Sequence, residues 1–262
     1  MITTLLSPET HPLQRLTLSR IQLDATSPVT SLETHGDEVL LYSLVGRADV
    51  YCNGRFLGSF GNRKQITERL VHAMRFPMGT EFTVALTVSG PAADIVCLTA
   101  TPPIQGNTLV NPHPYLHWND TVWNEVGAGC HLRQVAEVPT PEGFSIYTGE
   151  TLNIPGGTSS WPPHASPEDL RRFAAKETTW EEVMMFFCKE PGLADLQGIY
   201  TGGKIVNEVV RLENGSAQVM PLGSHRIVAA PDSYIWYHWS YCGTALQKSY
   251  RKFASDTKIY VK

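Results

Sequence analysis

The feature of this sequence that most limits its fold is a series of short, apolar and β-branched runs separated by turn residues. From residue 13 to residue 102 these runs recur at roughly the 8 to 12 residue spacing that is typical of an all-β sandwich or barrel. The clearest runs are 39–45, 48–52, 81–88 and 94–100. Asn-Gly pairs at 53–54 and 214–215 are strong hairpin signals. The chain therefore predicts an all-β fold.

The second half repeats the design of the first. Its strand-like runs are 133–135, 144–152, 197–201, 206–212, 217–220 and 234–241. The turn at 77–80, which introduces the run from Glu81, closely parallels the turn at 221–224, which precedes His225. Internal similarity of this kind indicates two copies of one structural unit.

A proline-rich stretch separates the two halves. Residues 102–130 carry four prolines among polar residues and predict a long connection. We therefore expect an N-terminal domain over residues 1–122 and a C-terminal domain over residues 123–262. At 262 residues and 42% hydrophobic composition, the chain is large enough for one large core or two small ones.

Composition excludes several functional classes. A net charge of -4, with Lys and Arg spread along the chain, gives no basic stripe for nucleic acid. The first residues lack the features of a signal peptide, and no run approaches the roughly 20 apolar residues of a membrane span. These features predict a cytoplasmic protein that contacts neither nucleic acid nor membrane. Five cysteines without CxxC spacing predict reduced, mostly buried thiols.

Three short pieces of the second half carry candidate metal ligands. His164 follows two prolines, and Glu182 lies in an apolar run that reads as a strand. His225 follows a Pro-x-Gly-Ser turn and is expected to open another strand. Imidazole nitrogen and carboxylate oxygen suit zinc, manganese, iron or nickel. We expect the three side chains to converge from adjacent strand ends of one barrel.

These pieces, in this order, resemble the second cupin domain of the 5-deoxy-glucuronate isomerase family of inositol catabolism. That family is similar to the ketol-isomerases that act on 4-deoxy-5-hexosulose uronate. The likeness also takes in 127–129 leading to Arg133, the segment 197–201 and the run 234–243. It implies two tandem cupin barrels of the double-stranded β-helix, or jelly-roll, type. It also implies a metal-dependent aldose-ketose isomerase that acts on a deoxy uronic acid in carbohydrate catabolism.

The sequence departs from the family pattern at one ligand. In the family the first piece reads Pro-Pro-His-x-His, and both histidines bind metal, whereas here Ser166 stands in the second position. The resemblance therefore implies His164, Glu182 and His225 as the ligands of a divalent metal, zinc first, with manganese, nickel or iron as alternatives. Ser166 begins a stretch with the pattern of a helix N-terminus, so we expect it to cap a short helix over 166–176.

The N-terminal copy lacks the ligand set, because Glu81 stands where the second copy has His225. Among other polar residues, Arg133 has two interpretations of equal weight: a bidentate partner for a substrate carboxylate, or a surface arginine. Tyr200 and Tyr237 are each either a hydroxyl lining the pocket or a core aromatic. His238 is either a core residue or, if its face points inward, the source of the missing nitrogen or of a base.

The leading hypothesis assigns the catalytic roles to Glu182, Tyr200 and Arg133, acting on a small sugar acid. A homo-oligomer is compatible with the sequence. One alternative is a non-catalytic cupin with a degenerate metal site that binds a sugar acid or acts as a structural partner. Another is a metal-dependent oxygenase, because two histidines and one carboxylate also form the pattern for non-haem iron.

Overall fold

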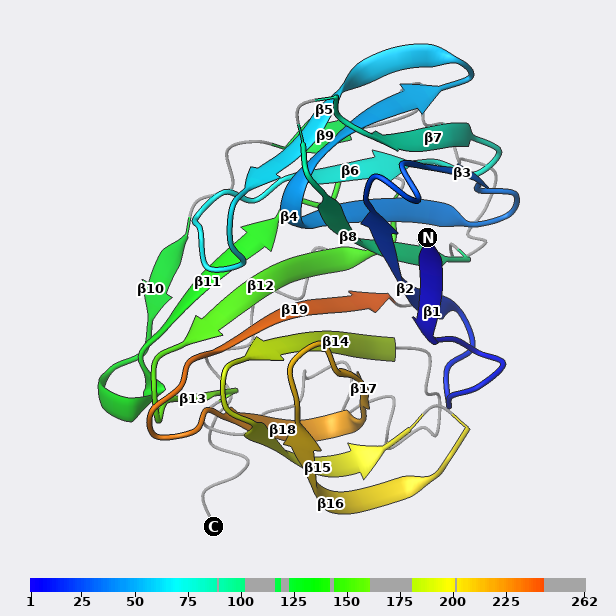
Figure 1. The fold of residues 1–262 in the computed structure, drawn as a ribbon. Helices are drawn as coiled ribbons and strands as arrows, with labels where there is room; N and C mark the ends of the chain where they lie inside the picture. Colours follow the sequence, from blue (N-terminus) through cyan, green and yellow to red (C-terminus); the bar gives the residue numbers. More distant parts are fainter. Residues whose placement is uncertain are drawn as a thin grey trace.

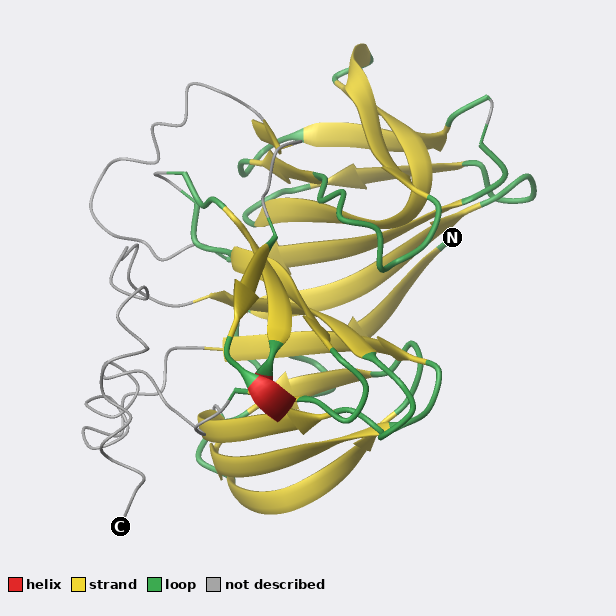
Figure 2. Ribbon diagram, turned by 90° about the vertical axis from the view of Figure 1, so that its left-hand side faces the viewer, coloured by secondary structure: helices red, strands yellow, loops and turns green. Residues whose placement is uncertain are grey.

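The computed structural model describes residues 1–88, 90–101, 116–118, 123–141, 144–160, 181–200 and 202–242. Strands dominate these residues, and the only helical element among them is a 3-10 turn, η1 (Gly129–His131). The strands form one nine-stranded, one six-stranded and one four-stranded antiparallel sheet. Figures 1 and 2 show these sheets curling into two stacked bodies. The all-β prediction is confirmed.

The nine-stranded sheet contains the first half of the chain. Its main path runs β1-β2-β8-β4-β6-β9, with β5 and β7 also paired to β4 and with β3 paired to β7. The bounds are β1 (Ile2–Leu6), β2 (Leu16–Leu23), β3 (Val29–Glu33), β4 (Glu38–Cys52), β5 (Arg55–Arg63), β6 (Ala73–Phe76), β7 (Glu81–Leu86), β8 (Ala93–Ala100) and β9 (Leu116–Trp118).

The predicted runs 39–45 and 48–52 are one continuous strand, β4. A register shift at Gly46, where φ is 82°, bends this strand so that it pairs with β6 and β8 before the bend and with β5 and β7 after it. The Asn53-Gly54 hairpin is confirmed, since both residues have positive φ between β4 and β5.

The second half forms the other two sheets. The six-stranded sheet has the order β10-β11-β12-β19-β14-β17, and the four-stranded sheet has the order β13-β18-β15-β16. The bounds of the first are β10 (Asn124–Val126), β11 (Arg133–Val138), β12 (Tyr147–Asn153), β14 (Glu181–Cys188), β17 (Ala217–Met220) and β19 (Ile235–Cys242). Those of the second are β13 (Thr158–Ser159), β15 (Gly192–Ile199), β16 (Ile205–Leu212) and β18 (Leu222–Val228).

Two sequence-based predictions differ from the structure, and a third is not tested by it. The stretch 102–130 contains β9, which pairs with β6, and β10, which pairs with β11, so part of the predicted connection is strand. The turn at 213–216 closes no hairpin, because β16 pairs with β15 whereas β17 pairs with β14. Backbone hydrogen bonds between this turn and Phe186 hold it on β14 instead. The predicted helix over 166–176 lies outside the described residues.

Apolar residues form three clusters. One fills the first barrel with residues such as Val39, Phe60 and Phe82, and one lies within the second barrel around Met184 and Phe186. The third cluster belongs to both halves. Its members from the first half include Leu18, Leu40 and Leu98, and those from the second include Val183, Met185 and Trp236. The two halves therefore share a continuous hydrophobic core. In Figure 1, β2, β8 and β4 of the first half lie above β12, β19 and β14 of the second.

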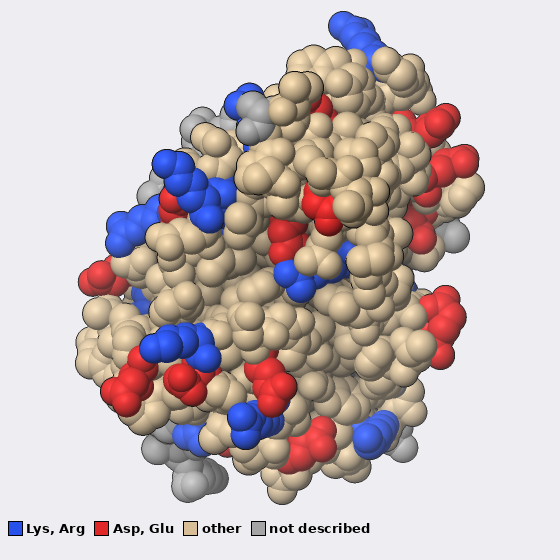
Figure 3. All heavy atoms as spheres, in the orientation of Figure 1, with Lys and Arg blue, Asp and Glu red and all other residues tan. Residues whose placement is uncertain are grey.

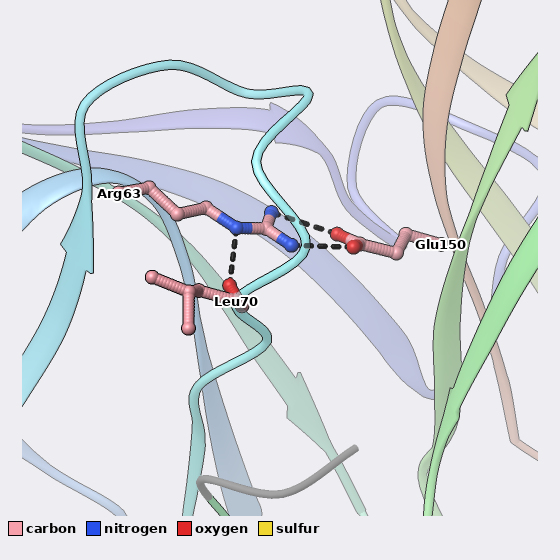
Figure 4. A network of polar contacts seen from close by, with 3 residues as sticks. All are labelled: Arg63, Leu70 and Glu150. Carbon is pink, nitrogen blue, oxygen red and sulfur yellow. Dashed lines mark hydrogen bonds and ion pairs between the residues drawn. The ribbon is translucent and has the colours of Figure 1, made fainter. Parts of the chain in front are cut away.

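Buried charged side chains cross this shared core. Arg63 on β5 forms an ion pair with Glu150 on β12, and both side chains are fully buried (Figure 4). Glu38 accepts hydrogen bonds from the backbone N–H groups of Ser145 and Ile146. Glu181 accepts bonds from three consecutive N–H groups, those of residues 14–16. Because a buried charge is tolerated only with good partners, these contacts fix how the halves meet.

Charged side chains are distributed unevenly over the surface. On the face drawn in Figure 3, basic side chains gather at the upper left and acidic side chains along the right edge, and both signs are interspersed in the lower half. All five cysteines are free, and four of them are buried, as predicted. None of the described residues belongs to a helix long and apolar enough to cross a membrane.

Candidate functional site in the second barrel

Strand alternation places two of the predicted ligands on the inner wall of the second barrel. Glu182 shares a face of β14 with the core residues Met184 and Phe186, and it lies opposite Met220 of β17. On β18, His225 lies opposite Leu196, which also belongs to the inner core. The carboxylate of Glu182 and the imidazole of His225 therefore project from two strands toward one interior.

The sequence suggested that His225 opens its strand, but the structure places it within the strand. Strand β18 begins at Leu222, directly after the single residue that separates it from β17, so His225 is the fourth residue of the strand. The cause is Gly223, whose φ of 141° lets the backbone run close to Gln197 and Gly198 of β15, where a Cβ would clash. The glycine that looked like a turn residue instead lies within the strand.

The two faces of β19 are now distinguished. Tyr237 and Ile235 belong to the inner core of the second barrel, whereas Trp236 belongs to the core shared by the two halves. His238 follows the alternation of Trp236, and its ring lies 4.3 Å from that of Tyr42 in the first half. It is therefore a core residue and cannot supply a nitrogen to the inner wall.

The environment of His238 agrees with a neutral core imidazole. Its Nε2 atom lies 2.7 Å from the hydroxyl oxygen of Thr148. Burial, assisted by the positive charge of Arg63, lowers the pKa of His238 to about 3. The imidazole stays uncharged at neutral pH.

Arg133 lies on the inner side of the six-stranded sheet. It is directly opposite Asn153 of β12, and Asn153 is opposite Ile235 of β19, so all three share one face. The Arg133 side chain is partly exposed, and its Nη1 atom donates to the carbonyl of His131 at 3.2 Å. The guanidinium thus lies at the edge of the inner wall, where it keeps donors for another partner.

The buried phenol of Tyr237 is within electrostatic range of Arg133 and Glu182. Tyr237 donates from its phenol to Oγ of Ser159 at 2.8 Å, and Asn153 donates from Nδ2 to the same oxygen at 2.9 Å. Burial is the largest cause of the raised pKa of Tyr237, which the charge of Glu182 raises and that of Arg133 lowers. The phenol is therefore a neutral donor at physiological pH, within electrostatic range of both charged residues.

Sequence reasoning missed Asn153 and Ser159. Ser159 comes just before the Trp-Pro-Pro-His piece that drew attention to His164, and Asn153 alternates with Thr151 on the same strand face. Each is a fully buried polar residue. Alternation with Tyr237 could have indicated them only if the inner face of 234–241 had been known, and the sequence alone left that face open.

Tyr200 lies elsewhere. It follows the last residue of β15 and packs in the core shared by the two halves, with Val206 and Val219. Its hydroxyl lies 3.4 Å from Oε1 of Glu208 and 3.5 Å from Nε2 of Gln218. The structure does not bring Tyr200 into the group formed by Glu182, His225, Arg133 and Tyr237.

His164 and Ser166 lie outside the described residues. Within the described part of the chain, no three His, Cys, Asp or Glu side chains group closely enough to hold a metal. The described donors, one carboxylate and one imidazole on facing strands of one interior, are of the kinds that a borderline divalent ion takes. Their chemistry fits such an ion if His164 provides the third donor.

Antiparallel sheets curled into two tandem barrels, each with its own apolar core, are the architecture of a bicupin. A solved IolB-like protein from Salmonella typhimurium LT2 has the same fold, with a TM-score of 0.76 and 19% identity over 94% of this chain and 89% of that one. An oxalate decarboxylase from Lactobacillus farciminis gives a TM-score of 0.63 and 13% identity over 93% and 81%.

Within this class the chain belongs to the KduI/IolB family, whose model matches residues 2–259. Curated relatives include the 5-deoxy-glucuronate isomerase of Shouchella clausii, which is 31% identical over 94 residues, 36% of this chain and 33% of the relative. That of Bacillus licheniformis is 29% identical over 98 residues, 37% of this chain and 35% of the relative. The alignments thus span about a third of the length of these relatives.

Proposed function

We propose that this protein is a metal-dependent aldose-ketose isomerase that acts on a deoxy uronic acid of the 5-deoxy-glucuronate type, in inositol catabolism. The observation that supports the proposal is the strand register of the second barrel, by which Glu182, His225, Arg133 and the buried Tyr237 all share its inner side. Family membership and the names of the curated relatives support the reaction class.

Isomerisation moves a proton between neighbouring carbons while negative charge grows on the carbonyl oxygen. A divalent ion, zinc in the first instance, held by His164, Glu182 and His225 would supply Lewis-acid stabilisation of that charge. Arg133 would orient the substrate, because a planar guanidinium forms two parallel hydrogen bonds with a carboxylate. The uncharged phenol of Tyr237 donates its proton to Oγ of Ser159, so its role would be to hold Ser159 in place on this wall.

The division of labour between the barrels rests on where the candidate residues lie, since Glu182, His225 and Arg133 all belong to the second half. The core of the first barrel consists of apolar side chains such as Met74, Phe76 and Ile95. We propose that the domain over residues 1–122 supports the domain over 123–262 and that the latter carries the chemistry in the cytoplasm. The sugar acid is then the small-molecule partner.

Metal analysis and one substitution test the proposal. Protein purified without added ions should contain zinc, manganese or nickel near one per chain and should isomerise 5-deoxy-glucuronate. Glu182→Gln keeps the size of the side chain but removes its charge, so it should lose both the metal and turnover. Glu137→Gln, at an exposed position of β11, is the matched control and should retain both. Unchanged turnover in Glu182→Gln would remove the assignment.

A second candidate is a non-catalytic cupin that binds a sugar acid. The observation in its favour is Ser166, which stands where the family pattern has a metal-binding histidine. This candidate predicts no metal even after loading, together with measurable binding of a uronate. Iron in the purified protein, with oxygen consumption on addition of substrate, would favour an oxygenase.

A further inference from the structure

Asn153 has one satisfied and one unsatisfied end. The residue is fully buried, and its Nδ2 atom donates to Ser159, but Oδ1 has no hydrogen-bond partner. A buried polar atom without a partner is rare in folded proteins and destabilises them. Exchanging the positions of Oδ1 and Nδ2 by an amide flip would still leave one polar atom without a partner, because Nδ2 would then occupy the position without a hydrogen bond. A ligand group that donates a hydrogen bond would satisfy this atom.

Ser159, also fully buried, has the complementary property. Its Oγ atom accepts from Asn153 and from Tyr237, which uses both acceptor positions of a hydroxyl. The proton of Ser159 is then left to donate, and no bond donated by it is found among the described residues. A free acceptor and a free donor thus lie on neighbouring side chains.

These residues connect the two sheets of the second barrel. Asn153 and Tyr237 come from β12 and β19 of the six-stranded sheet, and Ser159 comes from β13 of the four-stranded sheet. Asn153 lies opposite Arg133, and Ser159 lies opposite Ile227, two residues beyond His225 on β18. The trio therefore lies between the guanidinium of Arg133 and the strand that carries the candidate metal ligand.

We propose that Asn153, Ser159 and Tyr237 form a subsite that binds one hydroxyl group of a polyhydroxylated acid. A hydroxyl can donate to Oδ1 of Asn153 and accept from Ser159 at the same time, which satisfies both unpartnered groups. The inference deepens the proposed function and rests on it for the class of ligand. It makes the trio a specificity determinant, because a site built to bind a hydroxyl rejects analogues that lack it.

The test compares ligands that differ by one hydroxyl. Calorimetry measures binding of 5-deoxy-glucuronate and of its further deoxygenated analogues at C2, C3 and C4. The native protein should bind one of the three analogues about tenfold or more weakly than the parent compound. In Ser159→Ala and Asn153→Leu this difference should disappear, because the parent's affinity falls to that of the analogue.

Ser240→Ala is the matched control. Ser240 is a buried serine on the opposite face of β19, 2.8 Å from the hydroxyl of Thr148, and its loss should leave the discrimination intact. A structural role for the trio would lower affinity for all ligands by the same factor, which would overturn the proposal. Equal binding of all analogues by the native protein, or binding of none, would also overturn it. Binding needs no turnover, so discrimination without isomerisation would reject the isomerase and keep the subsite.

Discussion

The ion pair between Arg63 and Glu150 gives a quantitative prediction about stability. Both side chains are fully buried, Nη1 of Arg63 donates to Oε2 of Glu150 at 2.8 Å, and Nη2 and Nε reach Oε1 of Glu150 and the carbonyl of Leu70 (Figure 4). Replacing Arg63 by Met keeps much of the volume but leaves an unpaired carboxylate in the shared core. Breaking a buried pair in this way costs about 3–5 kcal/mol of unfolding free energy.

The loss should depend on pH. Burial already raises the pKa of Glu150, although Arg63 opposes the shift, so without Arg63 the pKa rises further. A carboxyl group with a raised pKa in the folded state stabilises the fold at low pH, and this stability is lost as pH rises from the unfolded to the folded pKa. The defect of Arg63→Met should therefore be largest at high pH and shrink by up to about 1.4 kcal/mol per pH unit on acidification.

Urea unfolding followed by tryptophan fluorescence measures the effect, since the chain contains six tryptophans and Trp236 lies within 6.0 Å of the Arg63 guanidinium. Titrations at several pH values should show one transition, because the two halves share a core. The double variant Arg63→Met/Glu150→Gln should recover at least half of the loss. A loss below about 1 kcal/mol, or one that does not change with pH, would refute the reasoning.

Three further predictions concern strands that carry the site. His238→Gln should reduce the loss of stability between pH 6.5 and about pH 3, because the depressed pKa of His238 lets the unfolded state bind one more proton there; the slope of unfolding free energy against pH measures this. Glu181→Ala should lower the unfolding free energy by about 3 kcal/mol or more, since three backbone donors lose a charged acceptor, whereas Glu137→Ala should change it little. Gly149→Ala should cost about 1–3 kcal/mol in the same assay, because a methyl group there meets the ring of Trp239; an unchanged melting curve would contradict that packing.

Most of the strands could be predicted from sequence because alternation and turn residues are local signals. β4 shows where such local signals fail. The runs predicted on either side of Gly46 are one continuous strand that bends at this residue. The turn at 213–216 shows another, because the Asn-Gly signal specifies a local turn but not which strands pair on either side of it. Pairing between distant strands depends on contacts that no short window contains.

The candidate site likewise contains residues that could be predicted from sequence and residues that could not. Alternation within β14 correctly grouped Glu182 with Met184 and Phe186, but the inner face of β19 could not be chosen, because both of its faces are bulky. Only the structure shows Trp236 in the shared core and Tyr237 in the second barrel. Asn153 and Ser159 were missed because a polar residue on a strand usually indicates a solvent-exposed face.

The shared core has a consequence for how this protein can be divided or simplified. If the second barrel were produced alone, Trp236 and its apolar neighbours on β14 and β19 would be exposed to solvent. Such a fragment should aggregate even though it keeps every candidate site residue. The first barrel therefore covers an apolar face of the second barrel that would otherwise be exposed to water. Destabilising substitutions in the core of the N-terminal half should then reduce activity at a site to which that half contributes no residue.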